Sequence, residues 1–459
     1  MGRIAVALVS TVVCSVLVAP AAQASSLAWK ENCAPDVDCA KLSVPVDWAH
    51  GGATMEVSLA RRKASGNRIG TIVYIPGGPG DPGAGQVMTE PRVSPVAAAR
   101  FDVIGINLRG TNDSNPVKCD ANLMNAMPDL NPDTGARYAD VLAYDRKLGE
   151  SCRTESGEIV DHLDSRNVAR DVEALRIALG EPQITIYSRS YGTLAAQMYA
   201  EMYPGRVRAL VLDSVFDHTQ DTWELLSSSV RTVEDSFDQF ARWCDANADC
   251  VLHGQDVKAL FDKLYGRAER GELADPADPA KKISPTALSW GIMRGYMYTP
   301  DWPGLAKRLA VLDGRPSLTF AVETVQVKNF PFAVACADHR LGFRSEQDWA
   351  TTWQRLKRIA PTMRTHMAWQ LVSFCAGWPL PITNPQSRPA IHIPVLLLNS
   401  RHDPASSFEW AQHLNRMFPR SALVARRAAG HGVYNRPECQ AVTDRYLVDK
   451  ILPAPGTEC

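Results

Sequence analysis

The chain has 459 residues, a formal net charge of −1 at pH 7, and 45% hydrophobic residues. This is enough apolar material for one large domain with an insertion, or for two domains. The near-neutral charge gives no electrostatic reason to expect binding to nucleic acid or to an anionic membrane surface.

Residues 1–24 have the pattern of a secretory signal peptide. Arg3 is followed by an apolar stretch from Ile4 to Ala19, and Ala22-Gln23-Ala24 supplies small residues for a cleavage site. The apolar stretch is short for a bilayer span, so we expect cleavage near Ala24 rather than a retained anchor. The sequence therefore predicts a secreted protein with no stable membrane association.

Short apolar runs rich in β-branched residues predict buried strands at residues 71–75, 102–106, 184–187, 207–212 and 394–399. Their continuous hydrophobicity suits a parallel sheet covered on both faces. Residues 167–179 carry apolar residues at helical spacing, and this alternation of strands and helices predicts an α/β fold. Residues 55–62 alternate in polarity and predict an antiparallel strand at the edge of the sheet.

The alternation of strands and helices stops between about residues 214 and 390. Apolar residues from Leu226 to Phe240 advance by four and three positions, which predicts an amphipathic helix, and further helical segments follow. Residues 272–282 read as an exposed loop. We therefore predict a core of residues 25–213 and 391–459, with a mostly parallel sheet, and a largely helical cap of residues 214–390 inserted before the last strands.

The stretch "YSRSYGT", residues 187–193, approximates the nucleophile elbow G-x-S-x-G, with Ser188 in place of the first glycine. Taken alone, the triplet S-x-G is as well explained by a surface turn. Here Ser190 directly follows a predicted strand and opens a predicted helix, and such a turn projects a nucleophile above a sheet. This context predicts that Ser190 is a catalytic nucleophile.

A glycine-rich loop, "IPGGPGDPGAG" at residues 75–85, follows another predicted strand. Acyl transfer needs two backbone N–H donors for the oxyanion, and the residue after the nucleophile, here Tyr191, supplies one of them. We expect Gly78 to supply the other, although a plain Gly/Pro turn remains the alternative. A phosphate cradle is disfavoured because the lysine and Ser/Thr of a P-loop are absent. No cofactor or metal is predicted.

Two loops near the C-terminus complete a catalytic set. Asp403 follows the predicted strand 394–399, and His431 lies in a glycine-flanked loop. The order Ser190, Asp403, His431 is the Ser, acid, His order of α/β-hydrolases. In this interpretation His431 accepts and returns the serine proton, while Asp403 orients the imidazole and stabilises the imidazolium. The sequence therefore predicts the α/β-hydrolase fold.

Other titratable residues compete for these roles. Asp213 is the main rival acid because it also ends a predicted strand. Asp338 and His339 lie in the inserted region, where they are less suitably placed, and His402 beside the predicted acid is interpreted as incidental.

The cysteines indicate disulfides. Removing Cys14 with the signal peptide leaves ten of the eleven cysteines, an even number, and no C-x-x-C pair suggests zinc. Spacing alone leaves the connectivity open. Pairing of neighbours is the simplest hypothesis, joining Cys33 with Cys39, Cys119 with Cys152, Cys244 with Cys250, Cys336 with Cys375, and Cys439 with Cys459.

The chain resembles the exported tripeptidyl aminopeptidases, relatives of the prolyl aminopeptidases. The resemblance rests on ordered matches through the mature chain: "PGGPG" at 76–80, "SYGT" at 190–193, "LDSVFD" at 212–217, "WCDANADC" at 243–250 and the ending "YLVDKILPAPGTEC". It implies a serine exopeptidase that releases tripeptides or similar short units from peptides with a free N-terminus. We expect a monomer.

The chain departs from the family pattern at three positions. Ser188 and Asn112 stand where the family usually has glycine, and Asn107 where it usually has aspartate. These departures keep two alternatives open: a carboxylesterase or amidase with the same triad, and an inactive binding protein of the same fold. Glu224 and Glu234 are conceivable ligands for a substrate ammonium, although acidic residues on such a helix usually face water.

Overall fold

The computed structural model describes residues 27–315 and 331–459, so the predicted signal peptide lies outside the described residues. At its centre is a nine-stranded sheet of order β1-β2-β3-β5-β4-β6-β7-β10-β11. The antiparallel part comprises β1 (Lys30–Ala34), β2 (Val37–Asp47), β3 (Gly51–Arg62) and β5 (Phe101–Ile106). From β5 onward the neighbours are parallel: β4 (Gly70–Ile75), β6 (Ile184–Arg189), β7 (Val207–Asp213), β10 (Val395–His402) and β11 (Ser421–Ala429).

This sheet confirms the predicted α/β class and its mostly parallel character. The five predicted apolar runs correspond to β4, β5, β6, β7 and β10. Residues 55–62 lie in β3, which is antiparallel as expected. The expectation of an edge position is wrong, because β1 and β2 lie outside β3 and their hydrogen bonds cover its outer side.

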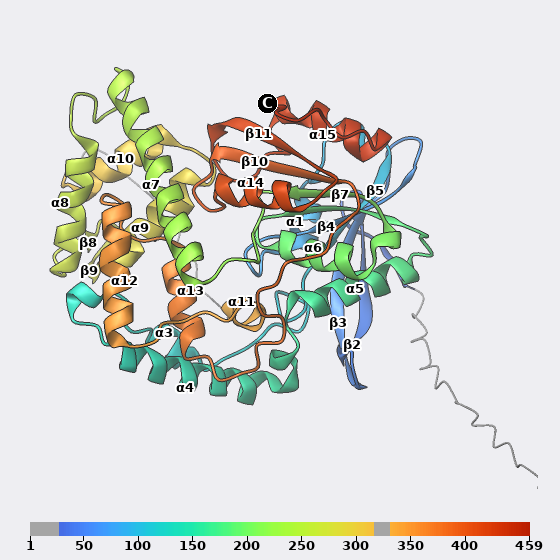
Figure 1. The fold of residues 1–459 in the computed structure, drawn as a ribbon, viewed down its shortest axis with the longest axis horizontal. Helices are drawn as coiled ribbons and strands as arrows, with labels where there is room; N and C mark the ends of the chain where they lie inside the picture. Colours follow the sequence, from blue (N-terminus) through green and yellow to red (C-terminus); the bar gives the residue numbers. More distant parts are fainter. Residues whose placement is uncertain (1–26, 316–330) are drawn as a thin grey trace, which may run out of the picture.

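Helices cover both faces of the sheet (Figure 1). One face carries α1 (Gly83–Thr89), α2 (Pro95–Ala98) and α15 (Pro437–Asp449); the other carries α5 (Ser165–Ala178), α6 (Gly192–Met202), the 3₁₀ turn η3 (Pro204–Arg206) and α14 (Phe408–Met417). Successive residues of β4 enter different cores: Tyr74 packs toward α1 and α15, whereas Val73 and Ile75 pack toward α5 and α6. Burial on both faces explains the continuous hydrophobicity of the parallel strands.

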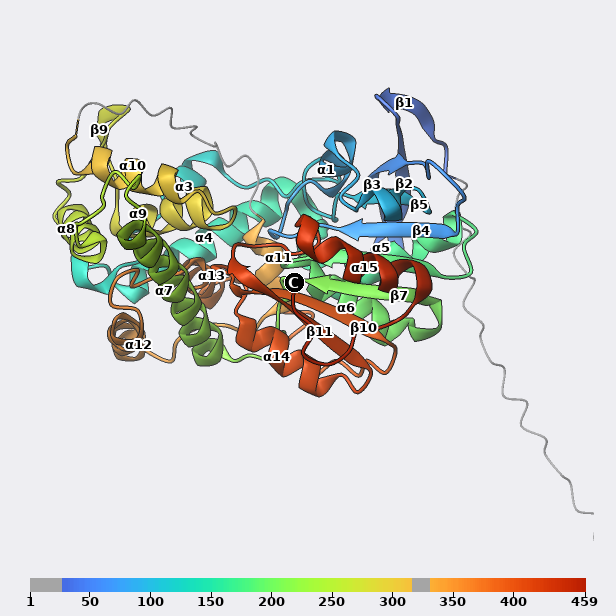
Figure 2. The ribbon, with the colours of Figure 1, turned by 90° about the horizontal axis from the view of Figure 1, so that it is seen from above.

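A mainly helical region lies beside the carboxyl ends of the parallel strands (Figure 2). It contains α7 (Thr222–Ala246), α8 (Val257–Glu269), α9 (Pro285–Ile292), the π-helical turn η4 (Met293–Met297), α10 (Trp302–Leu312), α11 (Phe332–Asp338), α12 (Glu346–Ile359) and α13 (Met367–Ala376). Side chains such as Phe237, Phe261 and Leu305 form a separate apolar core there. Residues 272–282, expected to form a loop, contain a small hairpin of β8 (Ala274–Asp275) and β9 (Asp278–Lys282).

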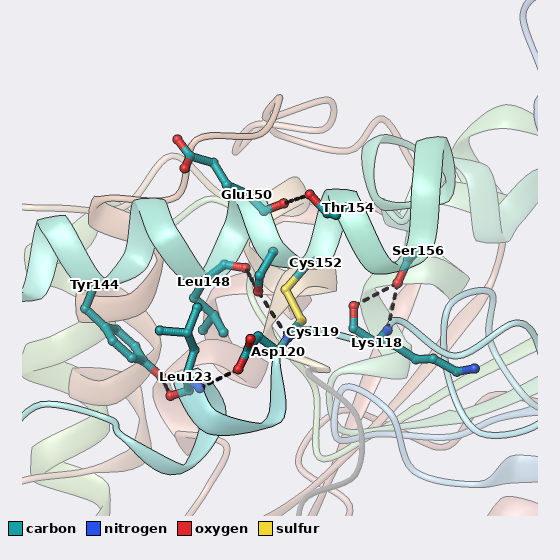
Figure 3. Close-up of a disulfide and its surroundings, with 11 residues drawn as sticks. Lys118, Cys119, Asp120, Leu123, Tyr144, Leu148, Glu150, Cys152, Thr154 and Ser156 are labelled. Atoms are coloured by element: carbon teal, nitrogen blue, oxygen red, sulfur yellow. Dashed lines mark hydrogen bonds between the residues drawn. A yellow bond between two sulfur atoms is a disulfide. The ribbon is translucent and has the colours of Figure 1, made fainter.

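The connection between β5 and β6 also reaches this helical region. It contains α3 (Ala121–Asn125), η1 (Pro132–Thr134), α4 (Tyr138–Ser156) and η2 (Gly157–Asp161), and α4 contacts both α12 and α13. Figure 3 shows how the Cys119–Cys152 disulfide fastens the loop before α3 to α4. Beside it, the Ser156 hydroxyl accepts a hydrogen bond from Lys118 N and donates one to Lys118 O. The disulfide and these hydrogen bonds hold the connection against the helix.

Five disulfides join Cys33–Cys39, Cys119–Cys152, Cys244–Cys250, Cys336–Cys375 and Cys439–Cys459. The pairing of neighbouring cysteines is thus confirmed in every case. The last bridge holds the C-terminal residues beside β11, where Cys459 N donates to Ala425 O and Ala425 N donates to Thr457 O.

Candidate active site

Ser190 occupies a sharp turn between β6 and α6. Its φ of 56° lies in the left-handed region, which non-glycine residues rarely adopt, and its N–H donates to Asp213 O at 2.8 Å. Strained backbone of this kind is typical of the turn that presents a nucleophile at the end of a strand. Ser190 lines a pocket between the sheet and the helical region.

The turn is so tight that its neighbours must be small. A methyl group added at Gly192 would lie 2.1 Å from Pro76 O, and one added at Gly77 would lie 2.7 Å from Ser190 Cβ. Ser188, the departure from the elbow pattern, is fully buried, and its hydroxyl donates to Val211 O at 3.2 Å. That hydrogen bond satisfies the extra polar group, so the serine fits this position in β6.

His431 and Asp403 form a buried pair at the end of the same sheet. Nδ1 of His431 lies 3.0 Å from each carboxylate oxygen of Asp403. Asp403 follows β10, and its carboxylate also accepts from the N–H groups of Ala405 and Ser406 at 2.8 and 3.0 Å. These donors fix the carboxylate, which in turn holds the imidazole of His431, and His431 lines the same pocket as Ser190.

The helical region also holds the histidine loop. The N–H of His431 donates to Tyr298 O at 2.7 Å, and the two rings pack with their centroids 4.9 Å apart. Tyr298 directly follows the π-helical turn η4, an irregularity that recurs at functional sites.

Asp213, the rival acid, meets a different set of partners. Its carboxylate accepts from Val433 N, from Tyr434 N and from the Tyr187 hydroxyl at distances between 2.8 and 3.0 Å. Burial raises the pKa of this carboxyl group above its ordinary value. Asp213 therefore fastens the backbone that follows His431 and leaves contact with the imidazole to Asp403.

The two predicted oxyanion donors lie at the same pocket as Ser190. Gly78 and Tyr191 line the pocket together with Ser190. Among the described residues, no backbone carbonyl accepts a hydrogen bond from the N–H of Gly78 or of Tyr191. Both groups are thus available to a developing negative charge.

Hydrogen bonding to a buried carboxylate holds the Tyr191 side chain in place. Its hydroxyl donates to Asp338 Oδ2 at 2.9 Å, and Asp338 also accepts from Ser165 and Asn384. Burial raises the pKa of Asp338 to about 7. The neighbouring His339 is buried too, which lowers its pKa to about 3. Neither residue lines the pocket.

The other two departures support the glycine-rich loop. Asn112 has a φ of 48°, a conformation that asparagine tolerates better than most residues, and its side-chain amide donates to Gly80 O at 3.0 Å. Asn107 Oδ1 accepts from Ala84 N at 3.0 Å, where the first turn of α1 begins. Both asparagines therefore make contacts compatible with an ordered site.

The walls of the pocket are mostly apolar. They include Phe216, Leu225, Phe332, Leu371 and Trp410, drawn from both the sheet side and the helical region. Its charged lining residues are Asp81, Arg189 and Arg294, beside His431. The sequence analysis did not select these three, because the only indication for Asp81 is its place in the glycine-rich loop.

The remaining candidates lie elsewhere. Glu224 closes a capping box with Asp221 at the start of α7, and Glu234 accepts from the N–H groups of Thr362 and Met363. Neither lines the pocket. His402 pairs with Asp235 at 2.7 Å, apart from the pair at His431.

Residues 27–315 and 331–459 lack two further features. They contain no cluster of three or more His, Cys, Asp or Glu side chains arranged to hold a metal ion. They also contain no helix with the length and apolar character needed to cross a bilayer.

Comparison with known proteins shows which hydrolases the chain is similar to. Residues 70–284 match a family model described as the alpha/beta hydrolase fold, and residues 360–459 match one described as TAP-like protein. The serine protease Hip1 of Mycobacterium tuberculosis is 27% identical over 92% of this chain and 87% of its own length. A tripeptidyl aminopeptidase of Streptomyces coelicolor is 28% identical over 93% and 84%, and the carboxylesterase B of Mycobacterium tuberculosis is 27% identical over 92% and 86%.

The fold and these matches define an α/β-hydrolase of the serine-hydrolase class. Within that class, the chain is similar to the tripeptidyl aminopeptidases over most of its length, and it is a serine peptidase of the α/β-hydrolase type.

Proposed function

We propose that this protein is a secreted exopeptidase that releases tripeptides or similar short units from peptide N-termini through an acyl-enzyme. The observation that carries the proposal is the buried Asp403–His431 pair. Nδ1 of His431 lies 3.0 Å from each carboxylate oxygen of Asp403, and His431 lines the same pocket as Ser190. The tripeptidyl aminopeptidase of Streptomyces coelicolor supports the peptide specificity.

The proposed chemistry gives each of these residues one role. Ser190 Oγ attacks the scissile carbonyl carbon while His431 Nε2 takes the hydroxyl proton, and Asp403 stabilises the imidazolium. The N–H groups of Gly78 and Tyr191 donate to the oxyanion of the tetrahedral intermediate. His431 then protonates the leaving amine, and an acyl-enzyme on Ser190 forms. Water, activated by His431, hydrolyses the ester and regenerates the serine.

The helical region, residues 214–390, would act as a cap in this enzyme. It supplies Leu225, Leu371 and Met367 to the pocket walls, so that the substrate is enclosed between cap and sheet. Enclosure by a cap limits the length of peptide that can extend beyond the acyl site, as an exopeptidase requires.

Secretion is proposed from the sequence of the first 24 residues. The five disulfides of the described residues support it, because disulfides persist in oxidising compartments. We propose that the mature enzyme acts as a monomer on peptides alone, without nucleic acid, membrane or cofactor.

A fluorophosphonate probe tests the nucleophile. We expect labelling of the wild type and none of Ser190→Ala, whereas Ser151→Ala, a matched change on α4, should label normally. Labelling of Ser190→Ala would refute the assignment, and an unlabelled wild type would favour the inactive binding protein.

Chromogenic substrates test the reaction. A tripeptide p-nitroanilide with a free N-terminus should be cleaved at least about tenfold more efficiently than its acetylated form, because an aminopeptidase recognises the ammonium group. The carboxylesterase B relative motivates the alternative, an esterase with the same triad. Cleavage of simple esters with no peptide turnover would establish that alternative.

A further inference from the structure

The pocket contains one acidic side chain that takes no part in the proposed triad. Asp81 is the only acidic side chain among the described residues that line the pocket. We infer that the Asp81 carboxylate binds the α-ammonium group of the substrate. This inference rests on the proposed function and names the residue that would recognise the free N-terminus.

Asp81 is held close to the reacting groups. It lies in the glycine-rich loop after β4, and its N–H donates to Gly77 O at 3.1 Å. Gly77 in turn packs against Ser190, leaving no space for a side chain between them. The Asp81 side chain is 26% exposed, so it belongs to the wall of the pocket and remains open to an incoming ligand. One hydrogen-bonded turn of backbone therefore connects the ammonium site to the nucleophile.

The carboxylate is only loosely paired within the protein. Its nearest cation, Arg294, is 3.8 Å away, longer than every other ion pair among the described residues. A charge-assisted hydrogen bond normally measures about 2.7–2.9 Å, so both oxygens of Asp81 retain capacity to accept from a ligand. The Arg294 guanidinium also lies over the Tyr298 ring, 4.9 Å from its centroid, and is half exposed.

The Asp81 carboxylate could compensate an ammonium group that enters the pocket. An ammonium group that enters a pocket with apolar walls loses hydration, and a carboxylate partner offsets that cost. The glutamates considered from the sequence cannot serve, because Glu224 caps α7 and Glu234 is engaged by backbone N–H groups.

The experiment compares a peptide p-nitroanilide with its N-acetylated form on purified variants. Asp81→Asn should lower kcat/KM for the free-amine substrate at least about tenfold and leave that for the acetylated substrate within about twofold. Asp81→Glu, which keeps the charge, should retain part of the preference for the free amine. Glu409→Gln, an exposed acid on α14 away from the pocket, is the matched control and should change neither substrate.

Arg294→Gln separates recognition from structure. If Asp81 binds the ammonium group, removing its competing cation should lower KM for the free-amine substrate. If the Asp81–Arg294 pair only stabilises the loop, both variants should weaken turnover of both substrates and lower Tm together, and the inference is wrong.

The proposed function and this inference fail in different ways. A wild type that shows no preference for the free amine would overturn the aminopeptidase assignment itself. A wild type with that preference, together with Asp81→Asn that retains it in full, would overturn only the role of Asp81.

Discussion

Asp213 and Asp403 end neighbouring parallel strands, β7 and β10, yet they meet different partners. Asp403 contacts the imidazole of His431, whereas Asp213 accepts hydrogen bonds from the backbone two and three residues farther along. One carboxylate would therefore act on the histidine, and the other on the loop that carries it.

Substitution of the two acids tests this division. Asp403→Asn should lower kcat by about 10³-fold or more, because the imidazole loses its orienting and stabilising carboxylate. Asp213→Asn should lower Tm and reduce kcat far less. Steady-state kinetics and thermal unfolding of the two variants measure both effects, and equal, mild losses of kcat would contradict the assignment of Asp403.

Ser188 and Asn112 stand where the family pattern has glycine, yet both residues fit the local backbone. Asn112 keeps the left-handed backbone that a glycine would adopt, and Ser188 finds an acceptor for its hydroxyl in β7. The family pattern at these places reflects space and backbone conformation, which asparagine and serine here also satisfy.

At the scale of elements, the junction of β6 and α6 depends on close approach to the loop after β4. Gly192→Ala should reduce activity at least about 10²-fold, because the new methyl group would lie 2.1 Å from Pro76 O and displace the turn that holds Ser190. Gly291→Ala in α9 is the matched control, since nothing lies within 4 Å of its added methyl group. That variant should keep full activity, and a Gly192→Ala enzyme of wild-type kcat would argue against the elbow.

Some elements escaped prediction for definite reasons. In β2, Leu42, Val44 and Val46 are buried and alternate with more exposed residues, but Pro45 interrupts the run and lowers the apparent strand propensity. The hairpin β8–β9 has a fully exposed second strand, so it lacks the apolar alternation that marks a strand. Pairing with the next strand in the chain, which the apolar pattern of a single segment does not record, decided both segments.

At the scale of the whole molecule, disulfides constrain the unfolded chain. The Cys119–Cys152 bridge closes a separation of 33 residues, and Cys33–Cys39 one of 6. Loop-closure entropy predicts stabilisation of about 3–4 kcal/mol for the first and about 2 kcal/mol for the second. Denaturant unfolding of the two double Cys→Ser variants should show the larger loss for Cys119/Cys152, and equal losses would contradict this entropic account.

Stability should also depend on pH through Asp145 of α4. Burial raises the pKa of this carboxyl group to about 8, and one oxygen accepts from Gly377 N while the other has no partner among the described residues. The folded state thus binds the proton more tightly than the unfolded state, so this group lowers the free energy of unfolding as pH rises from about 4 to 8.

Asp145→Asn should remove that loss. We expect its Tm to exceed that of the wild type by about 2–4 °C at pH 8 and to match it near pH 4. Asp140→Asn, an exposed acid on the same helix, is the control and should leave the pH profile unchanged. If the Tm of the wild type and of Asp145→Asn varied with pH in parallel, ionisation of Asp145 would not lower the free energy of unfolding, and the prediction would be wrong.

The sequence alone determined the class of fold and the five central strands, and it supplied neighbour pairing of the cysteines as the simplest hypothesis. The strands could be predicted because burial on both faces requires a continuous apolar run in each parallel strand. The cysteine pairing could be suggested because neighbouring cysteines close short loops. It also placed Ser190, Asp403 and His431 in the order of a hydrolase, and their catalytic roles stay predictions.

Only the tertiary structure decided which acid meets His431, which segments enclose the pocket, and that Asp81 shares it with Ser190. Side chains far apart in the chain come together through sheet order and helix packing, and no local pattern records those distances. In the sequence, Asp213 and Asp403 look alike because each lies where an apolar strand ends. In the structure they lie on neighbouring strands, and this difference makes Asp403 the partner of the imidazole and Asp213 an anchor of the backbone.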